Sequence, residues 1–267
     1  IHEGEAFLTL PLQRNFYNRY IKNSKERTVV IISDAMRYEV GRQLFLQMQD
    51  DPKCTAKMET MLGILPSYTR LGMAALLPHS SLSMKDDYTV QADERNCDNL
   101  ADRQTILQMY QPDALCLQFD DIKNRKIAEL REIFTGRQLL YVYHNQIDAR
   151  GDKANTEDEV FVACEEAVRE IMEFIHRIST SANTYHFIVT SDHGFLYKRD
   201  KITESEKISG VSGKKAFVNR RFIVSDSPVA GDGIDVLSLG KILGNEDTKV
   251  VSFPVSSHVF KVSGGGQ

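Results

Sequence analysis

The chain has 267 residues, of which 42% are hydrophobic and 26% charged, a globular composition with enough apolar residues for a sizeable core. The net charge of -4 excludes attraction of nucleic acid by the field of the whole molecule, although a local basic patch is compatible with it. No run approaches the ~20 apolar residues of a membrane span, and no signal peptide is recognisable.

The cysteines follow no CxxC spacing and no regular framework, which predicts reduced thiols in a cytoplasmic protein. They are Cys54, Cys97, Cys116 and Cys164. We expect a lead-in helix within residues 1–27 and one α/β domain over 28–267. Because the chain begins with Ile1 and ends in SGGGQ, we also expect it to be a piece of a longer protein.

The first third of the chain alternates helical and strand patterns. Apolar spacing predicts a helix over residues 5–24. Residues 28–34, TVVIISD, form a short apolar run that stops at an acid and precedes a helical pattern over 38–49. This order predicts a buried parallel strand followed by a crossover helix. Residues 56–65 are a candidate strand, and 69–77 a helix.

The middle of the chain repeats this alternation after a stretch of weak signals. We interpret residues 79–113 as an insertion over the sheet edge, with a short strand and a helix near 99–110. A buried strand is predicted at 114–119 and an amphipathic helix at 120–134, followed by Gly136 as a stop signal.

The last part contains the most regular helix. Strands are predicted at 138–144 and 186–190, on either side of a helix over 156–179 that Thr156 would cap. Further strands are expected at 216–226 and 250–262, with loops and turns between them. Alternating strands and helices predict an α/β fold with a mostly parallel central sheet and helices on both faces.

Three of the predicted strands end in metal-ligand side chains. Asp34 ends the first, and Asp192 and His193 follow the strand at 186–190 in the motif SDHG. The strand at 138–144 leads into Asp148 and Asp152 in IDARGD. Ligands of open α/β sheets bind at the carboxyl ends of the strands, and carboxylate with imidazole suits Zn²⁺ or Mn²⁺.

Structural roles compete with each of these residues. Asp34 and Thr69 both stand before helical patterns, where an N-cap is the ordinary role of Asp and Thr. Asp148 and Asp152 are four residues apart near a turn, where acids are usually solvated. Thr69 gains a second role if a metal holds its alkoxide, which would then be an activated nucleophile.

Basic side chains could neutralise phosphate oxygens, although charge runs are usually solvated faces. The candidates are Arg37, Lys214, Lys215, Arg220 and Arg221.

Four segments in this order resemble the PglZ domain of the alkaline phosphatase superfamily, with the greatest likeness to PglZ proteins of the bacterial BREX phage-defence system. They are SDAMRYE, PSYT, YHNQIDARGD and SDHGF, and the likeness spans residues 28–262.

The resemblance implies an alkaline-phosphatase-like fold and two divalent metal ions, with Zn²⁺ first and Mn²⁺ or Mg²⁺ as alternatives. By this analogy Asp34, Asp192, His193 and Thr69 hold one metal, and Thr69 is the nucleophile. Asp148 and Asp152 hold the other, although many relatives have a His at the position of Asp152.

A late His completes the second metal site in the superfamily. His258 is the only His after SDHG, and relatives carry a further His in a HisGlyGly segment close behind this region. Either His258 serves as this ligand, or the second site of this chain is incomplete.

We therefore predict a metal-dependent phosphatase or phosphodiesterase of a phage-defence system. It would act on a phosphoester, with a nucleic acid or nucleotide favoured, beside other BREX proteins and away from membranes. The alternative is a catalytically weak scaffold that binds other defence proteins. A receiver or nucleotide-binding domain fits less well, because the chain lacks GxxxxGK[ST] and is about twice a receiver's length.

Overall fold

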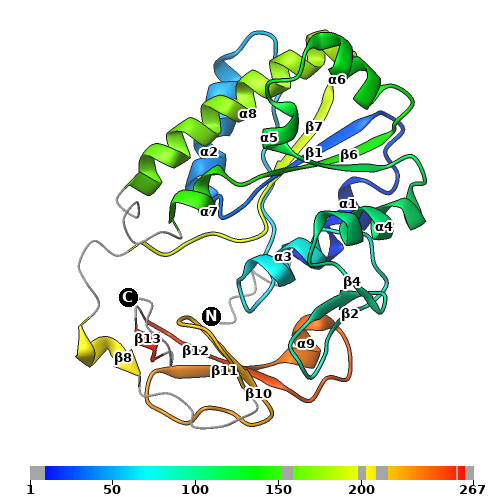
Figure 1. The fold of residues 1–267 in the computed structure, drawn as a ribbon. Coiled ribbons are helices and arrows are strands. Elements are labelled where there is room, and N and C mark those ends of the chain that lie inside the picture. The colour runs from blue at the N-terminus through cyan, green and yellow to red at the C-terminus, as the bar shows by residue number, and fades with distance from the viewer. Residues whose placement is uncertain (1–9, 152–158, 198–202, 209–215, 257, 262–267) are drawn as a thin grey trace. The chain divides into compact units, whose positions relative to one another are not determined.

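The computed structural model describes residues 10–151, 159–197, 203–208, 216–256 and 258–261. Contacts divide the chain into two compact units. The first contains residues 1–78 and 95–195, and the second contains residues 79–94 and 196–267. Both units can be followed by colour in Figure 1.

A parallel sheet forms the centre of the first unit. Its strands in spatial order are β5 (Leu115–Gln118), β6 (Leu139–His144), β1 (Thr28–Ser33) and β7 (His186–Thr190). All six residues of β1 are buried, as are all six of β6. The prediction of a fully buried parallel strand is therefore confirmed for these two. In contrast, β5 is buried only at Cys116, and β7 is half-buried along its whole length.

Helices flank this sheet on both sides (Figure 1). On one side α2 (Tyr38–Asp50) and α6 (Ile127–Phe134) pack against α8 (Val160–Ala182). The buried face of α8 repeats at helical spacing through Ala167, Val168, Ile171, Phe174, Ile175 and Ile178. The shorter helices of the unit are α1 (Phe16–Tyr20), α3 (Thr69–Ala75), α4 (Leu100–Tyr110), α5 (Phe119–Ile122) and α7 (Gln146–Gly151), with the 3₁₀ turn Gln13–Asn15 and the short strand β4 (Arg95–Asn96).

The second unit contains an antiparallel sheet. Its strands in spatial order are β11 (Ile234–Ser238), β12 (Val250–Pro254), β10 (Ile223–Ser225) and β9 (Ala216–Val218). Its other elements are β2 (Leu82–Met84), β3 (Val90–Ala92), β8 (Lys207–Ile208), α9 (Leu239–Leu243), β13 (Val259–Phe260) and the 3₁₀ turn Glu204–Glu206. Within the described parts of the chain, no helix has the length and apolarity needed to cross a membrane.

Several predicted elements are wrong in detail. Residues 56–65 do not form a strand. The segment makes only one isolated bridge, from its Leu62 to Leu12. The helix expected over 120–134 is two helices, α5 and α6, and the strand expected over 216–226 is the hairpin of β9 and β10. Within 227–249, where turns were expected, lie β11 and α9.

Two helices also begin at other residues than predicted. The lead-in helix is confined to α1 among the described residues, and Glu159 precedes α8. Thr156, the expected cap, lies outside the described residues. The end of α8 is Asn183 in the left-handed conformation, with φ of 49°.

The packing of α3 against Asp192, two residues after β7, requires a glycine. A Cβ built on Gly72 would lie 2.4 Å from the carbonyl oxygen of Asp192 and 2.8 Å from its carbonyl carbon. Both are backbone atoms, so no side-chain rotation relieves the overlap. Gly72 therefore sets the distance between α3 and the end of β7.

We predict that Gly72→Ala destabilises the protein by about 1–3 kcal/mol, the usual cost of overpacking a buried contact. Gly41→Ala is the matched control, because Gly41 is inside α2 and its added Cβ would meet only the sulfur of Met36, at 3.9 Å. That control should be about 0.5–1 kcal/mol more stable than wild type through helix propensity. Urea unfolding measures both, and equal effects would contradict the close approach.

Candidate active site

Asp34 and Asp192 emerge side by side from neighbouring parallel strands. Ile32 of β1 pairs with Thr190 of β7, and each acid lies two residues beyond its member of this pair. The side chains are nearly inaccessible, since Asp34 is 7% and Asp192 2% exposed as whole residues. The expected convergence of these two strand ends is confirmed.

The turn after β1 is built to meet Asp192. Ala35 has a φ of 62°, in the left-handed region that a residue with a Cβ rarely adopts. In this conformation its backbone N–H donates to Asp192 Oδ1 at 3.2 Å. The helix α2 begins only at Tyr38, with Arg37 as its N-cap, so Asp34 does not cap a helix.

His193 presents one ring nitrogen to both acids. Its Nε2 lies 3.6 Å from Asp34 Oδ1 and 3.4 Å from Asp192 Oδ2. Its Nδ1 lies 2.8 Å from the carbonyl oxygen of Gly194, an acceptor that favours the tautomer with the proton on Nδ1. Nε2 then carries a lone pair that points toward the carboxylates.

Thr69 reaches the same place from α3. Its Oγ1 lies 2.9 Å from His193 Nε2. The cap position of α3 is Tyr68, and no side chain makes the capping bond, so the alternative role of Thr69 as an N-cap is not realised. The structure thus brings Asp34, Asp192, His193 and Thr69 together.

The electrostatics of this group favour a bound cation. Burial, with the charges of Asp192 and Asp148 added, raises the pKa of Asp34 to about 8. Burial also raises the pKa of Asp192. Asp34 Oδ1 and Asp192 Oδ2 are buried and have no hydrogen-bond donor among the described residues. One ligand atom from each of Asp34, Asp192 and His193 lies within 4.8 Å of the other two, a spacing that a metal ion can bridge.

The second predicted pair is only partly described. Asp148 is half-buried in α7, and its charge acts on Asp34, but it lies outside the three-residue group above. Asp152 lies outside the described residues. His258 belongs to the second unit, where its Nδ1 contacts Ser256 Oγ.

His144, the last residue of β6, uses both of its ring nitrogens away from the candidate metal ligands. Nδ1 lies 3.1 Å from Ser33 Oγ, and Nε2 lies 3.2 Å from Glu170 Oε2. Its ring also packs edge-on against Phe119. These contacts give it a structural role in the core.

The basic candidates are engaged in contacts of their own where they are described. Arg37 lies over the ring of Phe195 and pairs with Glu39 at 2.5 Å. Arg221 is half-buried and donates to the carbonyl oxygen of His258 at 3.2 Å. Arg220 also has an interaction partner, and Lys214 and Lys215 lie outside the described residues.

Sequence reasoning missed Gln13, which links the site to the segment before Thr69. Its Nε2 donates to the carbonyl oxygen of Asp192 at 2.7 Å and to that of Ser191 at 3.1 Å. Its Oε1 accepts from Ile64 N–H at 2.8 Å. Gln13 is 2% exposed, and no local motif marks a buried amide so far from its partners in sequence.

Arg103 was also missed. It is 9% exposed, donates to the carbonyl oxygens of Cys97 and Asp98, and lies over the ring of Tyr143. Its positive charge opposes the rise in the pKa of Asp34.

Comparison with known proteins agrees with this geometry. A family model described as the BREX system PglZ alkaline phosphatase-like domain matches residues 14–267. The chain belongs to this PglZ family. The family's description as alkaline phosphatase-like confirms the expected fold class, an α/β fold with a mostly parallel central sheet.

Two relatives extend this finding. The PglZ domain is 36% identical over 265 residues to the alkaline phosphatase-like protein PglZ of Bacillus cereus (strain H3081.97). It is 33% identical over 267 residues to the alkaline phosphatase-like protein BrxZ of Escherichia coli O9:H4 (strain HS). The alignments cover 96% and 97% of this chain but only 30% and 31% of the relatives.

The raised pKa of Asp34 predicts a pH dependence of the metal-free PglZ domain. Because the folded pKa of about 8 exceeds the ordinary value of 3.8, stability is full at low pH, where both states are protonated. As the pH rises from about 4 to about 8, the unfolded state loses the proton first, so the free energy of unfolding falls. Asp34→Asn should remove this decrease and exceed wild type in stability at pH 8.

Urea unfolding in the presence of a chelator measures the effect at several pH values. The exposed Asp121→Asn is the control and should follow wild type. Parallel pH profiles of wild type and Asp34→Asn would contradict the burial of this acid beside Asp192.

Proposed function

We propose that this domain is a metal-dependent phosphohydrolase that uses Thr69 as its nucleophile. The observation that carries the proposal is the 2.9 Å distance between Thr69 Oγ1 and His193 Nε2, beside two buried carboxylates. A hydroxyl so close to a set of metal ligands matches the geometry of an activated nucleophile. The family's alkaline phosphatase-like description supports the same reaction class.

Asp34, Asp192 and His193 would hold the first metal ion, with Thr69 as a further ligand. Asp148 and Asp152 would hold a second ion. A bound divalent cation would supply charge neutralisation and Lewis acidity toward a phosphoryl oxygen. Zn²⁺ suits the imidazole and carboxylates of the first set, and the all-carboxylate pair suits Mn²⁺ or Mg²⁺ as well.

The chain's own groups then have defined tasks. Thr69 Oγ1 loses its proton and attacks phosphorus, so a bond from Oγ1 to phosphorus forms while the bond to the leaving oxygen breaks. The leaving alcohol takes up one proton. Water then cleaves the phosphothreonine and restores the hydroxyl, and the two steps sum to hydrolysis of one phosphoester bond. Gly72 and Gln13 position Thr69 relative to Asp192.

We favour a phosphodiester of a nucleic acid or nucleotide as the substrate class, and other BREX proteins as partners. The support is the family description, which names the BREX system. The curated relatives are more than three times as long as the aligned segment, so further parts of such proteins would contribute to substrate and partner choice.

Hydrolysis of a nitrophenyl phosphate monoester and of its diester, with Zn²⁺, Mn²⁺ or Mg²⁺, tests the proposal. Thr69→Ala should lower kcat at least about a hundredfold, because it removes the nucleophile. Thr69→Ser keeps a hydroxyl and should retain part of the activity. Thr105→Ala, at an exposed threonine of α4, should equal wild type.

Equal activity of Thr69→Ala and Thr105→Ala would remove Thr69 from this role. A purified protein that binds no divalent metal and hydrolyses neither ester would favour the alternative, a PglZ-fold scaffold that binds other defence proteins.

A further inference from the structure

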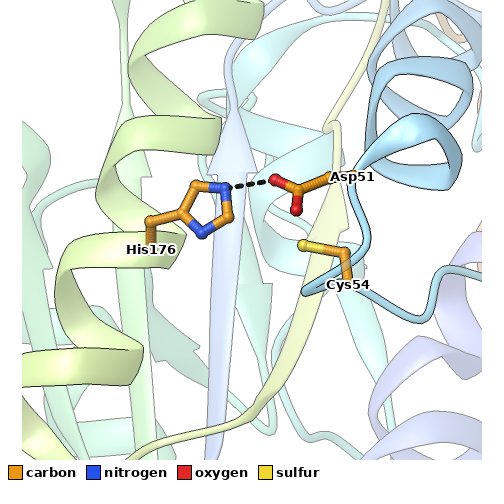
Figure 2. Close-up of side chains that lie close together, drawn as sticks. All are labelled: Asp51, Cys54 and His176. Atoms are coloured by element: carbon orange, nitrogen blue, oxygen red, sulfur yellow. Dashed lines mark ion pairs between the residues drawn. The ribbon is translucent and has the colours of Figure 1, made fainter.

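A second group of metal-ligand side chains lies where α2 ends beside α8. Asp51 directly follows α2, Cys54 comes three residues later, and His176 lies in α8. Figure 2 shows the three side chains directed toward a common space. One ligand atom from each lies within 4.8 Å of the other two. We propose that Asp51, Cys54 and His176 form a Zn²⁺ site that is separate from the sheet-edge group.

The turn after α2 orients two of the three ligands. Cys54 N–H donates to the carbonyl oxygen of Asp51 at 3.0 Å, which closes the turn. Lys53 N–H donates to Asp51 Oδ1 at 2.9 Å. This bond holds the carboxylate so that Oδ2 lies 2.7 Å from His176 Nε2, the contact drawn in Figure 2. Two ligands from one tight turn and a third from a helix are a common design of zinc sites.

The spacing suits a tetrahedral ion after small side-chain movements. Zn²⁺ bonds of about 2.0–2.3 Å place neighbouring tetrahedral ligands about 3.5 Å apart. The 2.7 Å between Asp51 Oδ2 and His176 Nε2 is shorter than this, so a bound ion requires these two atoms to move about 0.8 Å apart.

The charges of the ligands and the space beside them are both compatible with Zn²⁺. A thiolate and a carboxylate balance the two positive charges of Zn²⁺, and binding releases the thiol proton of Cys54. Three protein ligands leave one position for exchangeable water. An open cavity of about 720 Å³, lined by Gln47, Met172 and Thr180 among others, borders Asp51 and His176 and has room for it. Arg177 also borders the cavity, but its guanidinium donates to the carbonyl oxygens of Lys123 and Arg125.

The rival explanation is an ion pair alone, in which a protonated His176 meets Asp51 at the end of α2. That pair has no need of Cys54. The thiol therefore separates the two explanations, and sulfur also separates this site from the sheet-edge group, whose ligands are oxygen and nitrogen.

The experiment is titration of the metal-free protein with Co²⁺, which replaces Zn²⁺ and is visible by absorbance. Wild type should show a thiolate-to-cobalt charge-transfer band in the near ultraviolet, and Zn²⁺ should displace it. Cys54→Ser should abolish the band, and His176→Gln should weaken cobalt binding by more than about tenfold. The double variant Asp34→Asn with Asp192→Asn should keep the band, which makes the result independent of the proposed phosphohydrolase site.

Cys164→Ala is the matched control, because Cys164 lies on α8 like His176 but is 5% exposed and outside the group. It should keep the band. A band that survives Cys54→Ser, or no band in a wild-type protein that is folded by circular dichroism, would overturn the proposal and leave an ion pair.

Discussion

The structure of the first unit depends on two carboxylates that parallel strand pairing forces together. β1 and β7 are hydrogen-bonded neighbours, and each is followed by an acid that the sheet edge buries. Two buried negative charges repel each other and lose hydration, which is why the pKa of Asp34 rises to about 8. Such an arrangement costs stability unless a proton or a cation compensates it. Without a bound proton or cation, this pair of carboxylates therefore lowers the stability of the fold.

The surrounding structure keeps this costly pair in place with backbone contacts. Ala35 adopts a left-handed conformation so that its N–H meets one oxygen of Asp192, which leaves the other oxygen without a donor. Gln13 binds the carbonyl oxygen of the same residue, and Gly72 lets α3 contact it. Three separate segments therefore converge on Asp192, Ala35 at its carboxylate and Gln13 and Gly72 at its carbonyl group. The candidate ligands are thereby oriented by groups that are not ligands themselves.

The features of the fold and of the candidate site that could be predicted from sequence are those that local residue patterns determine. Buried parallel strands have continuous apolar runs, and the acid or histidine after each run marks the sheet edge, so Asp34, Asp192 and His193 were identified correctly as neighbours. Thr69 needed the family resemblance, since a threonine before a helix usually caps it. Gln13 could not be found, because its partners are 51 to 179 residues away and an amide carries no pattern of its own.

The wrong predictions share a physical cause. Residues 56–65 have strand-like composition, but they join a neighbouring segment at only one residue, and no sequence pattern reports the lack of a partner. The 120–134 pattern is helical on both sides of an interruption at residues 123–126. There the carbonyl oxygens of Lys123 and Arg125 accept from Arg177 of α8 instead of continuing one helix. Tertiary contacts thus override local preference in both places.

The two groups of ligands in the first unit differ in a way that burial explains. At the sheet edge the acids are buried and have oxygens without donors, so the charge imbalance itself favours a cation. At the end of α2 the side chains are half-exposed, Asp51 is satisfied by Lys53 N–H and His176, and the pKa of Asp51 is lowered. There the preference for a metal rests on the soft thiolate of Cys54 rather than on uncompensated charge. Buried oxygen and nitrogen ligands therefore compensate charge at the sheet edge, whereas the sulfur of Cys54 selects the kind of ion at the end of α2.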